Sequence, residues 1–357
     1  GGIPLTGRRG RVGVCGIGLS RFPATSDEPL LSTTSSATHT SAHAAMARLD
    51  VTETFRQITF PGHLHTQESL RYATDFQFRD TDTLIVTYPK SGTTWMQQAL
   101  TLLFSRGDAT LAQSVPNWAR APWLEQYYCP EVLKAAQGPR IITTHLPHHL
   151  LAPALQGSKA KVIYVARNPK DVAVSYYHFH KMANFLPQPR SFAEFLAEFM
   201  AGTLHYGSWF EHVRGWTRTA KDNSNFFYIT YEDMWQDLRG SLARIGTFLQ
   251  CPLEAEELNS SLRHCSFSSM KDNAMVNYTQ IPDEIMDHSK GQFMRKGKIG
   301  DWKTMFTVEQ SQRFDQVFQS EMQGSQLSFV WGCPGHLEPV EPLETRTSVE
   351  NPIVSVA

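Results

Sequence analysis

Apolar residues in this chain fall into short continuous runs and into longer stripes with helical spacing. Four runs, at 84–88, 140–144, 161–166 and 226–231, are rich in β-branched and aromatic residues, as expected for strands buried on both faces. The stripes between them repeat every three or four residues and predict helices. This alternation predicts a single α/β domain with a mainly parallel central sheet flanked by helices. A fifth run, 327–331, is a weaker strand candidate because it is short and stands alone.

Capping residues mark the starts of several predicted helices. An oxygen-bearing side chain at the N-cap accepts a hydrogen bond from the first helical turn, and a glutamate or glutamine three residues later completes a capping box. A short helix is also expected near 69–73, within a mixed lead-in at 51–80. The capping signals are Asn168 with Pro169, Ser191 with Glu194, and Thr307 with Gln310.

The run at 84–88 leads into a loop that is suited to bind phosphate. Pro89 ends the run, residues 90–94 are polar, and a helical stripe begins at Trp95. Free N–H groups at a helix N-terminus attract anions, and Lys90 adds a full positive charge. The loop is P-loop-like, although it lacks the G-x-x-x-x-G-K-[ST] pattern. The alternative is an ordinary strand-to-helix turn that carries a lysine by chance.

Polar residues follow the carboxyl ends of the four runs. Lys90 follows the first, His145 the second and Arg167 the third, and Tyr231 closes the fourth. In open α/β sheets, ligands bind at the carboxyl ends of the strands. We therefore expect these residues to share one site, although they are far apart in the sequence.

Basic residues in three segments predict a ligand with two phosphate groups. Arg167 is suited to hold a second phosphate in a bidentate geometry, with Ser175 donating from the helix that follows. The alternative for Arg167 is a surface ion pair with Asp171. The basic pair before the glycine in 295–297 allows close approach to an anion, and the alternative there is a solvated loop. Together with Lys90, these groups suit a 3′,5′-bisphosphorylated nucleotide.

Charge and cysteine content exclude several classes of function. The chain has 33 Lys and Arg against 34 Asp and Glu, so no basic surface for nucleic acid is indicated. It has no run of about 18 apolar residues, so no membrane span is predicted. The five cysteines are scattered and form no CxxC, which favours a reducing compartment and argues against a structural zinc.

Five motifs together resemble the cytosolic sulfotransferases, which use 3′-phosphoadenosine 5′-phosphosulfate (PAPS). The resemblance covers roughly 46–331, and its first and last motifs are highly specific. It implies in-line, metal-independent transfer of a sulfuryl group to a hydroxyl of a small apolar acceptor, leaving adenosine 3′,5′-bisphosphate (PAP). Golgi relatives carry a membrane span, so the resemblance also implies a cytoplasmic location. The motifs are YPKSGTTW at 88–95, THLP at 144–147, ARNPKDVAVSYYHF at 166–179, YED at 231–233 and RKGKIGDWK at 295–303.

The resemblance also implies roles for individual residues. His145 becomes the general base, a task that suits an imidazole, and Lys90 stabilises charge on the leaving oxygen. The implied acceptor pocket contains Trp123, Thr143, His145, Tyr176 and Phe179, with Phe60 and Phe78 as further aromatic candidates. The implied PAPS-binding residues are Lys90, Ser91, Gly92, Thr93, Thr94, Trp95, Arg167, Ser175, Tyr231, Cys265, Ser266, Phe267, Met270, Phe293, Met294, Arg295, Lys296 and Gly297.

The acceptor and the oligomeric state follow less directly from the family pattern. PWLE at 122–125 looks closer to the alcohol and hydroxysteroid branch, whereas YYHF at 176–179 looks closer to the phenol branch. Thr143 replaces a lysine found in many members, which weakens the case for a phenol specialist. The family's dimer segment ends in Glu, but here its last position is Gln312. We therefore expect an alcohol or hydroxysteroid acceptor, and a homodimer through 303–312 as a possible assembly.

The sequence suggests three alternatives to a sulfotransferase. The histidines at 148, 149, 178 and 180 suggest a metal site, but no Asp, Glu or Cys completes a ligand set on a helix face. A nucleotide kinase needs Mg²⁺ ligands and a complete Walker loop, and the sequence shows neither. A catalytically weak PAPS- or PAP-binding protein shares every phosphate contact and differs only in turnover.

The two ends of the chain differ in composition from its centre. Residues 1–45 are rich in Gly, Ser, Thr and Ala without any period, and residues 333–357 contain Pro and Glu without any period. Both are expected to be disordered. Met46 is a candidate natural start, which would make the leader a product of the gene model. The alternative is a transit peptide, since the leader is basic and rich in Ser and Thr. The predicted sulfotransferase domain is 46–332.

Overall fold

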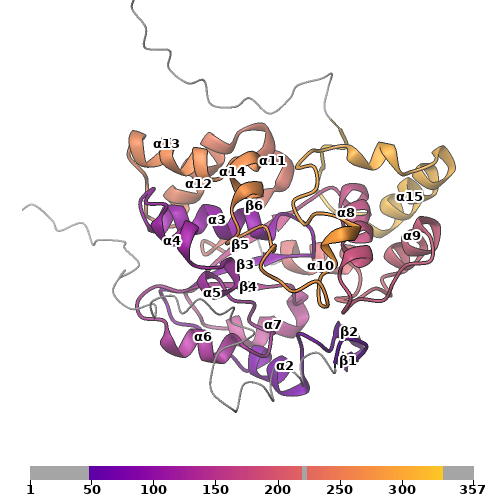
Figure 1. The fold of residues 1–357 in the computed structure, drawn as a ribbon, viewed down its shortest axis with the longest axis horizontal. Coiled ribbons are helices and arrows are strands. Elements are labelled where there is room, and N and C mark those ends of the chain that lie inside the picture. The colour runs from indigo at the N-terminus through magenta and orange to yellow at the C-terminus, as the bar shows by residue number, and fades with distance from the viewer. Residues whose placement is uncertain (1–47, 219–222, 333–357) are drawn as a thin grey trace, which may run out of the picture.

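A four-stranded parallel sheet forms the centre of the computed structural model, which describes residues 48–218 and 223–332 (Figure 1). The neighbouring strands are all parallel, which confirms the predicted α/β class. The predicted runs agree with the observed strands to within one residue at each end. In spatial order the strands are β4 (Ile141–Thr144), β3 (Thr83–Thr87), β5 (Lys161–Ala166) and β6 (Phe226–Thr230).

Helices cover both faces of this sheet. Neighbouring residues of each strand point to opposite faces, so each strand contributes to two apolar clusters. On β3, Leu84 and Val86 join one buried apolar cluster, whereas Ile85 joins the other. The first cluster includes residues of α2 (Gln67–Thr74), α6 (Cys129–Ala135), α7 (His148–Leu155), α8 (Pro169–Met182), α9 (Phe192–Ala201), α10 (Trp209–Arg218) and α15 (Val308–Glu321). The second includes residues of α3 (Thr93–Phe104), α4 (Thr110–Ser114), α11 (Tyr231–Gln236), α12 (Leu238–Phe248) and α13 (Ala255–His264).

Shorter elements complete the described chain, and capping confirms several predicted helix starts. The side chain of Asn168 accepts hydrogen bonds from the first turn of α8, and Thr307 with Gln310 forms a capping box on α15. Ser191 caps α9 by accepting from the Glu194 N–H. No helix among the described residues combines the length and the apolarity needed to cross a bilayer. The shorter elements are α5 (Asn117–Arg120), α14 (Phe267–Asp272), η1 (His288–Lys290) and η2 (Asp301–Thr304).

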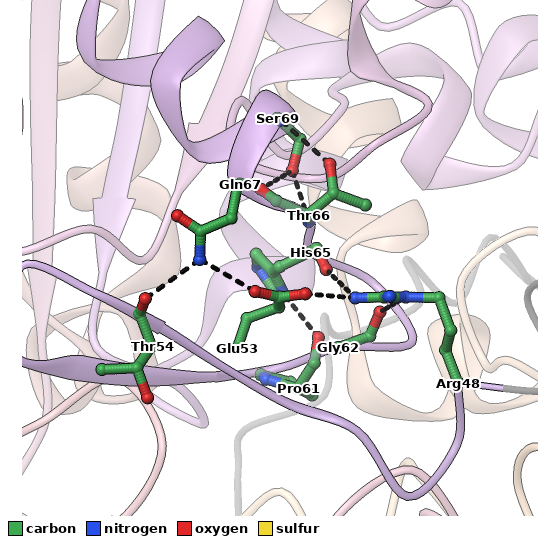
Figure 2. Close-up of polar contacts among 9 residues, drawn as sticks. All are labelled: Arg48, Glu53, Thr54, Pro61, Gly62, His65, Thr66, Gln67 and Ser69. Atoms are coloured by element: carbon green, nitrogen blue, oxygen red, sulfur yellow. Dashed lines mark hydrogen bonds and ion pairs between the residues drawn. The ribbon is translucent and has the colours of Figure 1, made fainter.

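The sequence analysis did not predict the antiparallel hairpin of β1 (Thr52–Phe55) and β2 (Ile58–Pro61). Figure 2 shows the polar network that joins this hairpin to the start of α2. The Arg48 guanidinium contacts the Glu53 carboxylate, which also accepts a hydrogen bond from the Gln67 side chain (2.8 Å). The hairpin is thus fixed by contacts with residues outside its own strands, which the local pattern does not reveal.

The weak strand candidate at 327–331 is wrong. Its residues have no regular secondary structure and pair with none of the strands among the described residues. Instead, Phe329 and Trp331 pack edge-on against Phe318 of α15, with ring centroids 6.2 and 5.0 Å apart. Aromatic packing, and not a ladder of backbone hydrogen bonds, therefore explains this apolar run. The expectations for 1–45 and 333–357 lie outside the described residues.

Candidate active site

The loop between β3 and α3 has the backbone geometry of an anion site. Gly92 is the N-cap of α3 in the left-handed conformation (φ 103°), and Lys90 also has a positive φ of 67°. A Cβ on Gly92 would lie 2.9 Å from the Tyr231 ring, so glycine is required there for space as well as for φ. The hydroxyl of Ser91 is buried and has no hydrogen-bond partner. The loop therefore offers unpaired donors at the positive end of a helix.

Lys90 lies between two aromatic rings. Its ammonium is 4.2 Å from the centroid of Phe179 and 4.0 Å from that of Phe293. Burial, together with the charges of Arg167 and Arg295, lowers the pKa of Lys90 to about 7. An anionic ligand in the loop would counter these effects and favour the ammonium form. An anion bound in the phosphate loop would therefore keep Lys90 positively charged.

Arg167 reaches the same loop from the end of β5. Its guanidinium donates to the carbonyls of Lys90 (3.1 Å) and Lys298 (3.2 Å), and it stacks over the ring of Tyr231 at 4.1 Å. Its buried Nε has no partner. The alternative ion pair with Asp171 is wrong, because that carboxylate accepts from the backbone N–H groups at 300 and 302. Arg167 therefore retains a donor for a ligand.

The segment at 295–297 supplies two more cations to the cavity that Arg167 lines. Arg295 and Lys296 both contact the Asp301 carboxylate at 2.6 Å. Gly297 has a φ of 61°, and a Cβ there would lie 2.2 Å from a ring carbon of Phe267. The Trp235 indole donates to the Gly297 carbonyl (3.0 Å). The alternative of a freely solvated basic loop does not fit these contacts.

The adenine-side candidates also come together at this place. Trp95 and Tyr231 meet edge to face with ring centroids 5.2 Å apart. The Trp95 indole donates to the Cys265 carbonyl (2.9 Å), which joins α3 to the start of α14. Two aromatic faces and the ring of Phe267 are thus available to stack on a planar base.

His145 has a tautomer that its two neighbours determine. The Thr87 carbonyl, which can only accept, lies 2.8 Å from Nδ1, and the Trp123 indole N–H, which can only donate, lies 2.9 Å from Nε2. Nδ1 therefore carries the proton, and the lone pair of Nε2 accepts the hydrogen bond from the indole. Burial and the nearby charge of Lys90 lower the pKa of His145 to about 4, despite the bond to Thr87. The imidazole is neutral at pH 7 and can accept a proton.

Glu125 is a residue beside His145 that the sequence analysis did not single out. Its fully buried carboxylate accepts from the His145 backbone N–H and from the Thr144 hydroxyl, both at 2.8 Å. Burial raises the pKa of Glu125 to about 7. A buried carboxylate that bonds two consecutive residues fixes the backbone that carries the imidazole. Its position in the 122–125 motif was the available signal.

One cavity of about 2480 Å³ joins the phosphate loop, His145 and an aromatic wall. Most predicted PAPS-binding residues line it, as do Trp123, Tyr176 and Phe179 of the predicted acceptor pocket. The predicted PAPS-binding residues on its wall are Lys90, Gly92, Thr93, Thr94, Trp95, Arg167, Ser175, Tyr231, Cys265, Ser266, Phe267, Met270, Phe293, Met294, Arg295, Lys296 and Gly297. Wall residues that the sequence analysis missed include Tyr127, Tyr128, Phe185, Leu186, Tyr206, Ile281, Ile285 and Met286.

Comparison with known proteins identifies the family. The Sulfotransferase domain family matches residues 80–326. The chain belongs to the sulfotransferase family. Sulfotransferase 2B1 from Homo sapiens is 45% identical over 278 residues, which cover 78% of this chain and 76% of that protein. Sulfotransferase 1A1 from Canis lupus familiaris is also 45% identical, over 268 residues, with 73% and 90% covered. The structure of mouse sulfotransferase SULT7A1 complexed with PAP has a TM-score of 0.64 at 32% identity, covering 77% of this chain and 95% of that one.

The family assignment confirms the predicted class of enzyme. The protein is a PAPS-dependent sulfotransferase. The unpaired donors on Ser91 and Arg167 fit its nucleotide donor. The glycines with positive φ at 92 and 297 also fit it, because they allow close approach. The nucleotide-kinase alternative is therefore wrong. The identity is the same to sulfotransferase 2B1 as to sulfotransferase 1A1, so the comparison alone does not fix the acceptor.

Some predicted wall residues of this sulfotransferase lie elsewhere. Thr143 is fully buried, where its hydroxyl donates to the Ala121 carbonyl and accepts from Gln97, so its placement in the acceptor pocket is corrected. Ser91 belongs to the phosphate loop but is fully buried and does not line the cavity. Phe60 and Phe78 also do not line the cavity. Among the described residues, no group of three or more His, Cys, Asp or Glu is placed to hold a metal ion.

Substituting alanine for Gly297 is expected to weaken PAP binding about tenfold, because the new Cβ pushes Phe267 out of the nucleotide site and strains the positive φ. Isothermal titration with PAP measures the effect. Gly291→Ala is the matched control, since a Cβ there meets nothing within 4 Å. Equal affinities for the two variants would show that Gly297 does not shape the nucleotide site.

Proposed function

We propose that this sulfotransferase transfers the sulfuryl group of PAPS to the hydroxyl of an apolar alcohol of the hydroxysteroid class, with His145 as the general base. The observation that carries the proposal is the tautomer of His145, whose unprotonated Nε2 belongs to a residue on the wall shared by the phosphate loop and the aromatic pocket. Proton removal is needed because an alcohol hydroxyl is a weak nucleophile.

The chain's own residues would perform the proton and charge transfers. PAPS, as the donor substrate, supplies the sulfuryl group. His145 takes the hydroxyl proton on Nε2 while the hydroxyl oxygen forms the new bond to sulfur, and the bond from sulfur to the bridging phosphate oxygen breaks. Lys90 stabilises the charge that develops on that leaving oxygen. The Thr87 carbonyl holds the Nδ1–H and stabilises the imidazolium that forms.

The nature of the acceptor follows from the cavity wall. Its acceptor side is mostly aromatic and aliphatic, including Trp123, Phe185, Tyr206 and Ile285, which favours burial of an apolar ring system. Position 143 carries a neutral threonine where many family members have a lysine, so it adds no charge near His145. We therefore favour an alcohol or hydroxysteroid over a phenol.

A panel of acceptors tests this proposal. Radiolabelled PAPS is supplied with a 3β-hydroxysteroid, a bile alcohol and a simple phenol, and labelled sulfate esters are separated and counted. We expect the highest kcat/KM for the steroid alcohols. Preference for the phenol would overturn the acceptor class. If PAP binds but none of the three is sulfated, the catalytically weak binding protein becomes the better description.

Replacing Arg167 with alanine is expected to weaken PAP binding by one to two orders of magnitude, because charge-assisted hydrogen bonds contribute about 1.5–3 kcal/mol. A thermal-shift titration without magnesium measures this effect. The wild-type protein should gain about 2.7 kcal/mol at a hundredfold excess of PAP over its dissociation constant. Arg313→Ala, which removes an exposed arginine on α15, is the control. An undiminished shift in Arg167→Ala would exclude Arg167 from the nucleotide site.

Two further parts of the proposal concern location and assembly. A cytoplasmic location remains a prediction, drawn from the family resemblance. The scattered cysteines agree with a reducing compartment, and Cys129 and Cys265 are free thiols in the structure. A homodimer through 303–312 also remains a prediction. Val308 in this segment is 76% exposed.

A further inference from the structure

The indole N–H of Trp123 is hydrogen-bonded to Nε2 of His145, which is the nitrogen that would accept the proton in the proposed reaction. Its N–H donates to Nε2 at 2.9 Å, and both residues are buried on the cavity wall. The backbone around Trp123 is held against β4, where the Leu124 N–H donates to the Thr143 carbonyl and the Thr143 N–H donates to the Pro122 carbonyl, both at 2.8 Å. The contact is therefore built into an extension of the sheet.

The contact matters because an imidazole nitrogen has only one lone pair in the plane of the ring. While the indole N–H points at that lone pair, neither water nor an acceptor hydroxyl can donate to it. The other nitrogen is already committed to the Thr87 carbonyl. His145 thus has no free acceptor site until the indole moves.

We propose that Trp123 is a plug on the general base, which an acceptor hydroxyl must displace before sulfuryl transfer begins. The proposal rests on the proposed role of His145. The plug would have two consequences. It keeps the base from activating water beside bound PAPS, and it makes an acceptor provide a hydroxyl that competes with the indole.

The reaction that the plug suppresses is hydrolysis of the donor. A water molecule would give its proton to Nε2 and form a bond from its oxygen to sulfur. The bond from sulfur to the bridging phosphate oxygen would break, giving PAP and sulfate. Every atom comes from water and PAPS, so access to the base is the only further requirement.

The Trp123→Phe variant tests the first consequence, because it keeps an aromatic ring but removes the N–H. We expect release of labelled sulfate from PAPS without acceptor to rise about two- to tenfold, the range set by the loss of one hydrogen bond. Trp302→Phe is the matched control, since it removes an indole N–H that donates to the Trp331 carbonyl and Trp302 does not line the cavity. Its rate of PAPS hydrolysis should equal that of the wild type. Hydrolysis that is unchanged in Trp123→Phe would overturn the plug.

A pair of ligands tests the second consequence. The affinity of a hydroxysteroid relative to its deoxy analogue should rise about two- to tenfold in Trp123→Phe, because only the hydroxylated ligand has to displace the indole. A merely structural role for Trp123 predicts equal losses for both ligands, and that result would contradict the plug. The comparison uses binding in the presence of PAP, so it does not depend on turnover.

A third test uses the wild-type protein, so that no substitution perturbs the site. The ¹H–¹⁵N resonance of the Trp123 indole, identified by its loss in Trp123→Phe, should move when hydroxysteroid is added with PAP and stay in place with the deoxy analogue. A resonance that responds equally to both ligands would refute the proposal. Absence of any sulfated product in wild type would instead refute the proposed function, so the two failures are distinguishable.

Discussion

Replacing His145 with alanine will abolish sulfation of every acceptor and leave PAP binding near its wild-type affinity. The expected loss in kcat is 10²- to 10⁴-fold, which is typical for removal of a general base. The physical reason is that the unprotonated Nε2, whose tautomer Thr87 and Trp123 determine, is the proton acceptor that we propose for the reaction. Initial rates with radiolabelled PAPS and a hydroxysteroid measure the change.

The matched control for this prediction is His149→Ala, which removes an exposed histidine four residues along the chain. It should retain wild-type kcat. Titration of both variants with PAP separates loss of the base from loss of the nucleotide site. If His145→Ala keeps most of its activity, His145 is not the base. If it loses PAP binding in parallel, the residue acts through the nucleotide site.

Acidification is expected to destabilise the folded protein strongly below pH 6. Burial holds the pKa of several histidines far below the ordinary value of 6.5. Because the unfolded chain binds protons that the folded chain excludes, the free energy of unfolding falls as pH drops below 6.5. The loss is about 2 kcal/mol for each such histidine at pH 5. Burial lowers the pKa to about 3 for His65 and His212, and to about 4 for His145, His180 and His205.

Three buried carboxyls act in the opposite direction but do not cancel the histidines. Burial raises the pKa of Glu125 and of Glu232 to about 7 and also raises the pKa of Asp171, so the folded state gains protons there as pH falls. Their gain offsets part of the loss from the five histidines, which leaves a net loss on the order of a few kcal/mol between pH 7.5 and pH 5. That is a large part of the 5–15 kcal/mol that stabilises a typical domain.

Urea unfolding at pH 7.5, 6.5, 5.5 and 5.0, followed by tryptophan fluorescence, measures this dependence. The variant His205→Gln removes a buried histidine whose Nδ1 has no partner, so its pH dependence should be shallower by about 2 kcal/mol at pH 5. The exposed His149→Gln should behave as wild type. A free energy of unfolding that stays constant from pH 7.5 to pH 5 would show that these histidines are not held neutral by the fold.

The sequence predicted the framework of the site because that framework follows from local rules. Buried apolar runs gave the four strands, and parallel strands bring their carboxyl ends to one edge, so Lys90, His145 and Arg167 converge as expected. The β1–β2 hairpin was missed because Arg48 and Gln67, outside its strands, hold it in place.

Side-chain directions within the site could not be predicted in the same way. Thr143 immediately precedes Thr144 and lies two residues before His145, yet it turns into the core to bond Gln97, which a period-2 pattern does not distinguish from a turn into a pocket. The contact from Trp123 to His145 spans 22 residues and depends on an extra strand-like bridge along β4. Such contacts arise from tertiary packing.

The central claim is that a neutral imidazole removes the acceptor proton without a metal. Single-turnover transfer from radiolabelled PAPS to a hydroxysteroid, measured in excess EDTA from pH 6.5 to 8.5, tests it most directly. We expect a rate that changes less than tenfold across this range, because burial holds the pKa of His145 near 4, well below it, and bound PAPS favours the ammonium form of Lys90. A rate that rises tenfold with each pH unit, or that needs added Mg²⁺, would contradict it.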